Sequence, residues 1–289
     1  MIEKVINDYV ALINERINSL IPESDSAYKI INDAQRYSLL SGGKRIRPII
    51  LLEFCQLCGG KIEDALDFAA CLEMIHTYSL IHDDLPCMDN DDFRRGNPSC
   101  HKVFGENIAL LAGDKLLTTA FAVAAASDVP DDRKIKALQV LANSANGMIN
   151  GQVLDLKYET QKPNIPQLRY MYNLKTGCLI YAAAVIGCIL GGADEATLEL
   201  AESYAINLAL AFQIIDDILD VTGNEMLLGK PVGSDADNNK TTFATILGIN
   251  EASKEAEKYT HEALANLVML NQDAKTLKEL TSYLLKRNF

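Results

Sequence analysis

Apolar residues recur at three- and four-residue steps along almost the whole chain, and this spacing limits the fold more than any other feature. The N-terminal stretch is the first example, with Ile2, Val5, Ile6, Tyr9, Val10, Ile13 and Ile17. Such steps place apolar side chains on one face of an α-helix. The same pattern predicts helices over 28–40, 47–58, 63–82, 107–127, 131–155, 165–172, 176–191, 194–221 and 252–286. Because sustained period-two alternation bounded by hairpin turns is absent, residues 1–289 are expected to form a single all-α domain, one large helical bundle.

The segments that interrupt the helices carry most of the chemistry. They are SGGKRIRP at 41–48, DDLPCMDNDDFRRGNPS at 83–99, the plain connector ETQKPNIPQ at 159–167, and GNEMLLGKPVGSDADNNK at 223–240. A polar loop as long as the last one is unusual inside a compact domain unless it is functional or mobile. We therefore expect 223–240 to act as a lid.

Composition and charge exclude several classes of protein. Hydrophobic residues make up 48% of the chain and charged residues 23%, which indicates a globular fold. The net charge of -12 disfavours general nucleic-acid binding, which needs a basic face. The apolar segment 179–193 is too short to span a membrane and is expected to be a buried helix. The N-terminus shows no signal-peptide pattern, so we expect a cytoplasmic protein.

The seven cysteines are scattered, which fits a reducing compartment. Cys55 and Cys58 form a CxxC pair that is typical of zinc or redox sites. A second CxxC or a suitably spaced histidine pair is absent from the sequence, so we favour two small apolar residues in a buried helix.

Two clusters of aspartates are the main candidates for a functional site. The first places Asp83, Asp84 and Asp89, with two further aspartates, within ten positions directly after an apolar helix. The second is FQIIDDILD at 212–220, where Asp216 and Asp220 are four residues apart on one helix face. If the two helices face each other, their carboxylates line opposite walls of one cavity, as in metal sites built inside helix bundles.

The metal that best fits these walls is Mg²⁺. It takes oxygen ligands and binds through one or two carboxylates together with water and substrate phosphates. Two acidic walls are therefore expected to bind several Mg²⁺ ions, and these in turn a diphosphate. A solvated helix end explains a lone acidic run better than a metal does, but it does not explain two runs embedded in apolar helices.

Several basic residues lie in the segments around the aspartates. They are Lys44, Arg47, Arg94, Arg95, Lys175, Lys230 and Lys240. Arginine suits bidentate binding of phosphate, and lysine acts as a point charge. An acidic protein with its bases placed this way is suited to two anionic ligands, one bound through metal and one through cations.

The motifs GGKRIRP, DDLPCMDNDDFRRG, GQVLDL, KTG, FQIIDDILD and GKPVGSDADNNKTT occur here in the order seen in the trans-prenyltransferases, or isoprenyl diphosphate synthases, which the chain resembles from about residue 35 to 245. The resemblance implies an all-α bundle around a deep central cavity and a homodimer. It also implies a Mg²⁺-dependent reaction, with three ions, that joins isopentenyl diphosphate to an allylic diphosphate.

The resemblance also assigns roles residue by residue. The expected metal ligands are Asp83, Asp84, Asp89, Asp216, Asp217 and Asp220. The residues expected at the allylic substrate are Arg94, Lys175, Thr176, Gln213, Lys230 and Lys240. The expected pocket for isopentenyl diphosphate consists of Lys44, Arg47, His76 and Arg95. Asp83, Asp84, Asp89, Lys175, Asp216 and Lys230 are expected to contribute directly to catalysis.

Product length is expected to depend on the helix turn before Asp83. Tyr78 and Ser79 precede Asp83 by five and four residues, about 6 to 8 Å along the helix axis. The bulky Tyr78 is expected to close the cavity floor, as in bacterial farnesyl diphosphate synthases, which favours a C15 product. A C20 product remains the alternative, and Tyr78 as an ordinary core residue is the simpler reading.

Three other classes fit the sequence less well. A non-catalytic relative would be expected to lose one aspartate motif, and both are intact. A terpene cyclase has no use for an isopentenyl diphosphate pocket and is typically rich in aromatic residues, whereas this chain has no Trp. A helical Ca²⁺-binding protein would need the alternating ligands and central glycine of an EF-hand loop.

Overall fold

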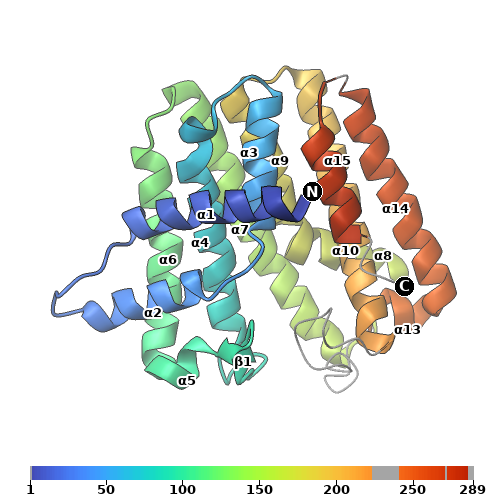
Figure 1. Cartoon of the computed structure of the whole chain (residues 1–289). Helices are drawn as coiled ribbons and strands as arrows, with labels where there is room; N and C mark the ends of the chain where they lie inside the picture. The colour runs from blue at the N-terminus through green and yellow to red at the C-terminus, as the bar shows by residue number, and fades with distance from the viewer. Residues whose placement is uncertain (1, 223–240, 271, 286–289) are drawn as a thin grey trace.

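The computed structural model describes residues 2–222, 241–270 and 272–285. Almost all of the regular structure in these ranges is helical (Figure 1). The elements up to the middle of the chain are α1 (Ile2–Leu20), α2 (Lys29–Leu40), α3 (Ile46–Leu57), α4 (Ile62–Asp83), β1 (Phe93–Arg94), β2 (Asn97–Pro98), α5 (Cys100–Phe104), α6 (Glu106–Ala126) and α7 (Asp131–Thr160). The remaining elements are α8 (Ile165–Tyr172), the π-helix η1 (Asn173–Gly177), α9 (Cys178–Gly191), α10 (Glu195–Thr222), α13 (Phe243–Leu247), α14 (Ile249–Met269) and α15 (Lys275–Leu285).

The prediction of an all-α fold is confirmed, with two local differences. The helix expected over 252–286 is two helices, α14 and α15, and that prediction was wrong. Polar residues break the apolar pattern there, and the Asp273 side chain accepts a hydrogen bond from the backbone N–H of Lys275 (3.3 Å) at the start of α15. The sequence also gave no sign of β1 and β2, an antiparallel pair of two residues per strand, because such short strands carry no periodicity.

The long helices stand side by side, while α1 and α2 cross in front of α3, α4 and α6 in the view of Figure 1. Helix α3 packs along α9, α4 along α6, and α10 along α14. One continuous cluster of buried apolar residues runs between them. The close α3–α9 contact depends on Gly187, because a Cβ atom there would meet the carbonyl of Leu51 and lie 2.8 Å from the Cβ of Phe54.

Helix α9 lies in the core, as the sequence predicted for 179–193. Two helical stretches, Glu106–Ala126 and Ile165–Gly191, are long and apolar enough to cross a membrane by length and composition. Most of the second is buried inside the bundle, as in the core helix of a soluble protein. The first is only one-third buried, so α6 presents an apolar face to the outside of the chain.

Cys55 and Cys58 lie at the end of α3, where Cys55 belongs to the apolar core and Cys58 is half-buried against it. Cys55 is buried, and its thiol donates to the carbonyl oxygen of Lys61 (3.6 Å). Within the described ranges, groups of three or more His, Cys, Asp or Glu side chains arranged to hold a metal are absent.

Candidate active site

The first aspartate cluster begins where α4 ends. Pro86 disfavours helical backbone at Leu85, so the chain leaves the helix after Asp83. It then folds back on itself, and the backbone N–H of Asp89 donates to the carbonyl oxygen of Asp83 (2.9 Å). This turn brings Asp89 beside Asp83, as the sequence predicted.

Asp84 is paired with Arg94 from β1. The Arg94 Nε atom donates to Asp84 Oδ1 (2.9 Å), its Nη2 atom contacts the same oxygen, and Nη2 also pairs with Asp91 (3.2 Å). Burial raises the pKa of the Asp84 carboxyl, and the hydrogen bond from Arg94 partly offsets that rise. Arg94 therefore lies against a predicted metal ligand.

Asp83 is half-buried at the end of α4. Burial raises its pKa from 3.8 to about 6, with Lys175 working in the opposite direction and Asp89 adding to the rise. A carboxylate that is costly to ionise is stabilised when a cation arrives. This group is therefore suited to bind a metal ion.

The lysine of the KTG motif is positioned by the π-helix η1, which lies between α8 and α9. Such single-turn π-helices are frequent at functional sites. Lys175 Nζ donates to Asp155 Oδ2 on α7 (2.5 Å). Gly151, one turn before Asp155, lets α7 approach closely, because a Cβ atom at this glycine would lie 2.5 Å from the Cα of Lys175.

The second aspartate cluster is connected to the same π-helix. Thr176 Oγ1 donates to Gln213 Oε1 (2.9 Å), and Gln213 lies one turn before Asp217, with its Nε2 atom 3.4 Å from Asp217 Oδ1. The Tyr172 hydroxyl donates to Asp217 Oδ2 (2.7 Å), and the backbone N–H of Phe243 donates to the same oxygen (3.0 Å). Asp217 and Asp220 are both buried.

The π-helix η1 connects the two clusters, because Lys175 lowers the pKa of Asp83 and Thr176 donates to Gln213, one turn before Asp217. Helices α4 and α10 both end at the lower side of the bundle in Figure 1. Lys175 of η1 lowers the pKa of Asp83. Burial lowers the pKa of Arg47, and the charge of Asp216 offsets part of that decrease. Lys175 thus acts on the first aspartate cluster, and Arg47 is affected by the charge of the second.

The predicted basic pocket is only partly assembled from the expected residues. Arg47 Nη1 lies 3.4 Å from His76 Nε2. Arg95 lies 3.8 Å from the carboxylate of Glu73, one turn before His76 on α4. The pKa of His76 is well below its usual value because of burial first and the nearby Arg47 second, so the ring is neutral and accepts from Arg47. Lys44 instead has its Nζ atom 4.8 Å from the centre of the Tyr283 ring on α15.

Tyr78 and Ser79 occupy different faces of α4. At 100° per residue, Ser79 shares a face with Asp83, while Tyr78 points toward His82, with the two rings edge to face at 5.7 Å. Tyr78 is 5% exposed, and its buried hydroxyl has no hydrogen-bond partner within the described ranges. Burial and, second, the charge of Asp83 raise its pKa to about 12.

A pocket with about 340 Å³ of empty space lies between α2, the end of α4 and the β1–β2 pair. Its lining includes Asp84, Arg94, Arg95 and Thr77. The Thr77 hydroxyl is buried without a hydrogen-bond partner among the described residues. This pocket adjoins the first aspartate cluster, and the deep central cavity implied by the resemblance stays a prediction.

The donor set fits Mg²⁺ even though it does not form a complete cage. Mg²⁺ usually takes one or two carboxylates and leaves its other positions to water and substrate phosphate, so a preassembled group of three protein ligands is not required. The half-buried carboxylate of Asp83, whose pKa is raised by burial despite Lys175 nearby, supplies negative charge that such an ion would neutralise. Lys230, Lys240 and the expected lid at 223–240 lie outside the described residues.

Four residues of the site were not predicted: Arg45, Glu73, Asp155 and Tyr172. Asp155 lies inside the GQVLDL motif, and its place four residues after Gly151 could have suggested a role on the same helix face. Glu73 precedes His76 by three residues on α4, which is a weaker signal of the same kind. Tyr172 contacts Asp217, 45 residues later in the chain, and Arg45 contacts Glu73, 28 residues later. Local spacing in the sequence gives no sign of such contacts.

Comparisons with known proteins agree with this geometry. The family model described as Polyprenyl synthetase matches residues 28–284. The chain is 43% identical over 287 residues to a farnesyl diphosphate synthase of Micrococcus luteus, which covers 97% of this chain and 96% of the relative. It is 42% identical over 282 residues to a geranylgeranyl diphosphate synthase of Cyanophora paradoxa, covering 96% and 93%. The crystal structure of geranylgeranyl pyrophosphate synthetase from Pyrococcus horikoshii Ot3 matches with a TM-score of 0.90 and 32% identity, covering 99% of this chain and 98% of that one.

Proposed function

Because the chain belongs to the polyprenyl synthetase family and is a trans-prenyl diphosphate synthase, we propose that it makes farnesyl diphosphate. In this reaction isopentenyl diphosphate is joined head to tail to dimethylallyl diphosphate, and then to the geranyl diphosphate that results. Each step releases one diphosphate. The observation that supports a C15 product is the buried Tyr78, close enough to Asp83 for that carboxylate to raise its pKa.

The site residues support a reaction in which a diphosphate leaves an allylic carbon. Mg²⁺ held by the aspartates would neutralise the diphosphate and so lower the cost of breaking the allylic C–O bond. Lys175, oriented by Asp155, supplies a further positive charge where negative charge develops. The apolar walls around α4 and α10 keep water away from the cation on the substrate.

The remaining assignments complete this proposal. Arg47, Arg95, His76 and Lys44 hold isopentenyl diphosphate, so that its double bond faces the allylic carbon and catalysis is largely positioning. The aspartates would hold three Mg²⁺ ions, which would neutralise the allylic diphosphate. Lys230 and Lys240, which lie outside the described residues, are assigned to the allylic diphosphate on the sequence motif alone.

A C20 product is the second candidate, and one observation favours it. Ser79, rather than Tyr78, shares the face of α4 that carries Asp83, and its small side chain donates to the carbonyl of His76 (2.9 Å). A chain growing along that face would pass a serine.

The proposed enzyme is a homodimer. Helix α6 exposes apolar side chains to the outside of the single chain, among them Leu110 (45% exposed) and Leu111 (48%). An apolar helix that is only one-third buried, with two neighbouring exposed leucines, is consistent with an interface. A cytoplasmic location remains a prediction from the sequence.

The test is a product analysis. Purified protein is incubated with isopentenyl diphosphate, dimethylallyl diphosphate and Mg²⁺, and the chain length is read by mass spectrometry, with a metal-free reaction as control. The proposal predicts a metal-dependent C15 product. A main product of C20 would support the second candidate, and absence of condensation with any allylic starter would contradict both.

The role of Tyr78 is tested by Tyr78→Ala, which is expected to lengthen the main product. The matched control is Tyr259→Ala, the same change at a similarly buried tyrosine (7% exposed) on α14, a helix that carries neither aspartate cluster. It is expected to leave the product at C15. An unchanged product distribution in Tyr78→Ala would remove this residue from the account of chain length.

A further inference from the structure

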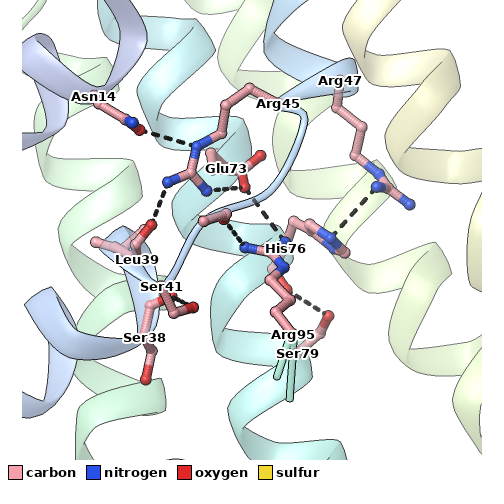
Figure 2. A network of polar contacts seen from close by, with 11 residues as sticks. Asn14, Ser38, Leu39, Ser41, Arg45, Arg47, Glu73, His76, Ser79 and Arg95 are labelled. Carbon is pink, nitrogen blue, oxygen red and sulfur yellow. Dashed lines mark hydrogen bonds and ion pairs between the residues drawn. The ribbon is translucent and has the colours of Figure 1, made fainter. Parts of the chain in front are cut away.

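One buried carboxylate on α4 is shared by two arginines (Figure 2). Glu73 is 2% exposed, and its Oε1 atom lies 2.7 Å from Arg45 Nη1 and 3.8 Å from Arg95 Nη2. The two guanidinium groups are therefore no farther apart than the sum of these distances, about 6.5 Å. Like charges this close inside a protein require a negative charge between them.

The guanidinium of Arg45 donates its hydrogen bonds to other groups of the protein. Besides Glu73, its Nε atom donates to Asn14 Oδ1 on α1 (3.0 Å), and its Nη2 atom donates to the carbonyl oxygen of Leu39 at the end of α2 (Figure 2). The side chain is almost completely buried. Arg45 is thus an anchor that ties Glu73 to two neighbouring elements, rather than a group that meets substrate.

Arg95 and Arg47 make fewer contacts with polar protein groups than Arg45 does in the described part of the chain. Arg95 Nη1 donates to the carbonyl oxygen of Gly42 (2.5 Å), and its guanidinium lies so close to Gly43 that a Cβ atom there would be 2.8 Å from Cζ. The Nε atom of Arg47 is buried and has no hydrogen-bond partner in the described part of the chain. Arg47 thus retains a donor for an anionic ligand.

The backbone supports a functional reading of this network. Arg45 and Arg95 both have left-handed backbone, with φ of 51° and 53°. Side chains other than glycine adopt this conformation rarely, and it persists where surrounding contacts impose it, often at functional sites. Here the contacts of both guanidinium groups converge on Glu73.

The negative charge of Glu73 also affects the pKa values of two neighbouring arginines. Burial lowers the pKa values of Arg47 and Arg95, and the charge of Glu73 is the largest influence that opposes burial at both. Three arginines surround one carboxylate, so the network keeps a net positive charge toward a diphosphate.

We propose that Glu73, anchored by Arg45, is a positioning residue for isopentenyl diphosphate, because it fixes the guanidinium of Arg95 in the orientation that receives the diphosphate group. This inference rests on the proposed function. In this proposal Arg45 and Glu73 support the pocket through Arg95, and neither contacts the substrate.

Positioning and simple electrostatics predict opposite results when the charge of Glu73 is removed. A negative charge near an anion site repels the anion, so charge alone predicts that Glu73→Gln binds isopentenyl diphosphate more tightly. If Glu73 orients Arg95, its loss leaves two guanidinium groups that repel each other, and Arg95 turns away from the pocket. The positioning role therefore predicts weaker binding.

The experiment measures binding of isopentenyl diphosphate to the full-length protein by calorimetry without Mg²⁺, and then the KM of each substrate. For Glu73→Gln we expect the Kd and KM of isopentenyl diphosphate to rise about 10- to 100-fold, the scale on which supporting residues act on a ligand-binding group. The KM of the allylic substrate is expected to change by less than about twofold. Glu53→Gln is the matched control, because Glu53 on α3 is a partly buried carboxylate that accepts from the Tyr9 hydroxyl (2.6 Å) outside the pocket.

A second variant guards against misfolding. Replacing both partners, Arg45→Met with Glu73→Met, removes the fully buried Arg45 guanidinium together with its carboxylate, so the most deeply buried charge is not left unpaired and the protein is expected to fold. It should show the same selective loss of isopentenyl diphosphate binding. Unchanged or tighter binding in either folded variant overturns the proposal, as does equal weakening of both substrates, which marks a purely structural role. A wild-type protein that binds no isopentenyl diphosphate overturns the proposed function as well.

Discussion

Gly151 offers the sharpest test of how the lysine of the KTG motif is positioned. A Cβ atom at this position would lie 2.5 Å from the Cα of Lys175 and 2.8 Å from the carbonyl carbon of Leu174. Ordinary contacts of a Cβ atom begin near 3.4 Å. In Gly151→Ala the π-helix must therefore move away from α7 by 3.4 minus 2.5, about 0.9 Å at the Lys175 Cα. The obstacle is backbone, which cannot rotate out of the way.

Such a shift is large enough to affect turnover. Misplacement of a catalytic group by about 1 Å can cost on the order of 100-fold in rate. We expect the kcat of Gly151→Ala to fall by about that factor, and overpacking to lower the free energy of unfolding by about 1 to 3 kcal/mol. The assay is steady-state condensation with saturating substrates and Mg²⁺, alongside urea unfolding.

Gly147 is the matched control, one turn earlier on the same helix. Its added Cβ would lie 2.5 Å from the Sγ atom of Cys178, the end of a side chain that can change rotamer. Gly147→Ala is expected to keep kcat within a few-fold of wild type. Equal losses in the two variants, or a Gly151→Ala enzyme with wild-type kcat, would refute the argument that backbone contact with η1 sets the position of Lys175.

Three further predictions follow from the same contacts. Burial raises the pKa of Asp83 from 3.8 to about 6, so ionised Asp83 destabilises the metal-free fold at pH 7. Asp83→Asn should therefore raise the free energy of unfolding in EDTA by about 2 to 3 kcal/mol, while abolishing turnover. The cost is absent below pH 4, grows between the unfolded and folded pKa values, and is complete above pH 6, so urea unfolding at pH 4 should show no such gain. Tyr172→Phe removes the hydroxyl that donates to Asp217 and should weaken Mg²⁺ activation about 10-fold, seen as a shift in the Mg²⁺ dependence of rate with little change at saturating metal. Leu111→Asp on the exposed face of α6 should convert a dimer to a monomer by light scattering, and a variant that stays dimeric would place the interface elsewhere.

The helices were predictable because each carries its own signal. Apolar spacing located α2, α3 and α4 to within a residue or two, and the glycines and prolines between them marked the connecting segments. The same reasoning failed at 252–286, where apolar spacing continues across a break made by a few polar residues before Lys275. A signal that depends on spacing does not detect a short interruption.

The site was predictable where its residues are clustered in sequence and not where they meet across the fold. Asp83 and Asp89 are six positions apart, and the turn between them was read from Pro86. The pair between Arg45 and Glu73 joins a loop to a helix and requires left-handed backbone at the arginine, which the sequence gives no reason to expect. Single charged residues in helices carry no local mark of such partners, so only the packed structure reveals them.

The central claim is that the two aspartate clusters bind divalent metal together with a diphosphate. The most direct measurement is the number of Mn²⁺ ions, substituted for Mg²⁺, that the protein binds with and without inorganic diphosphate, counted by electron paramagnetic resonance. The account predicts that diphosphate strengthens Mn²⁺ binding and brings the number to three, and that Asp83→Asn and Asp216→Asn each reduce it. Mn²⁺ binding that is the same without diphosphate, or that survives the loss of either cluster, would contradict it.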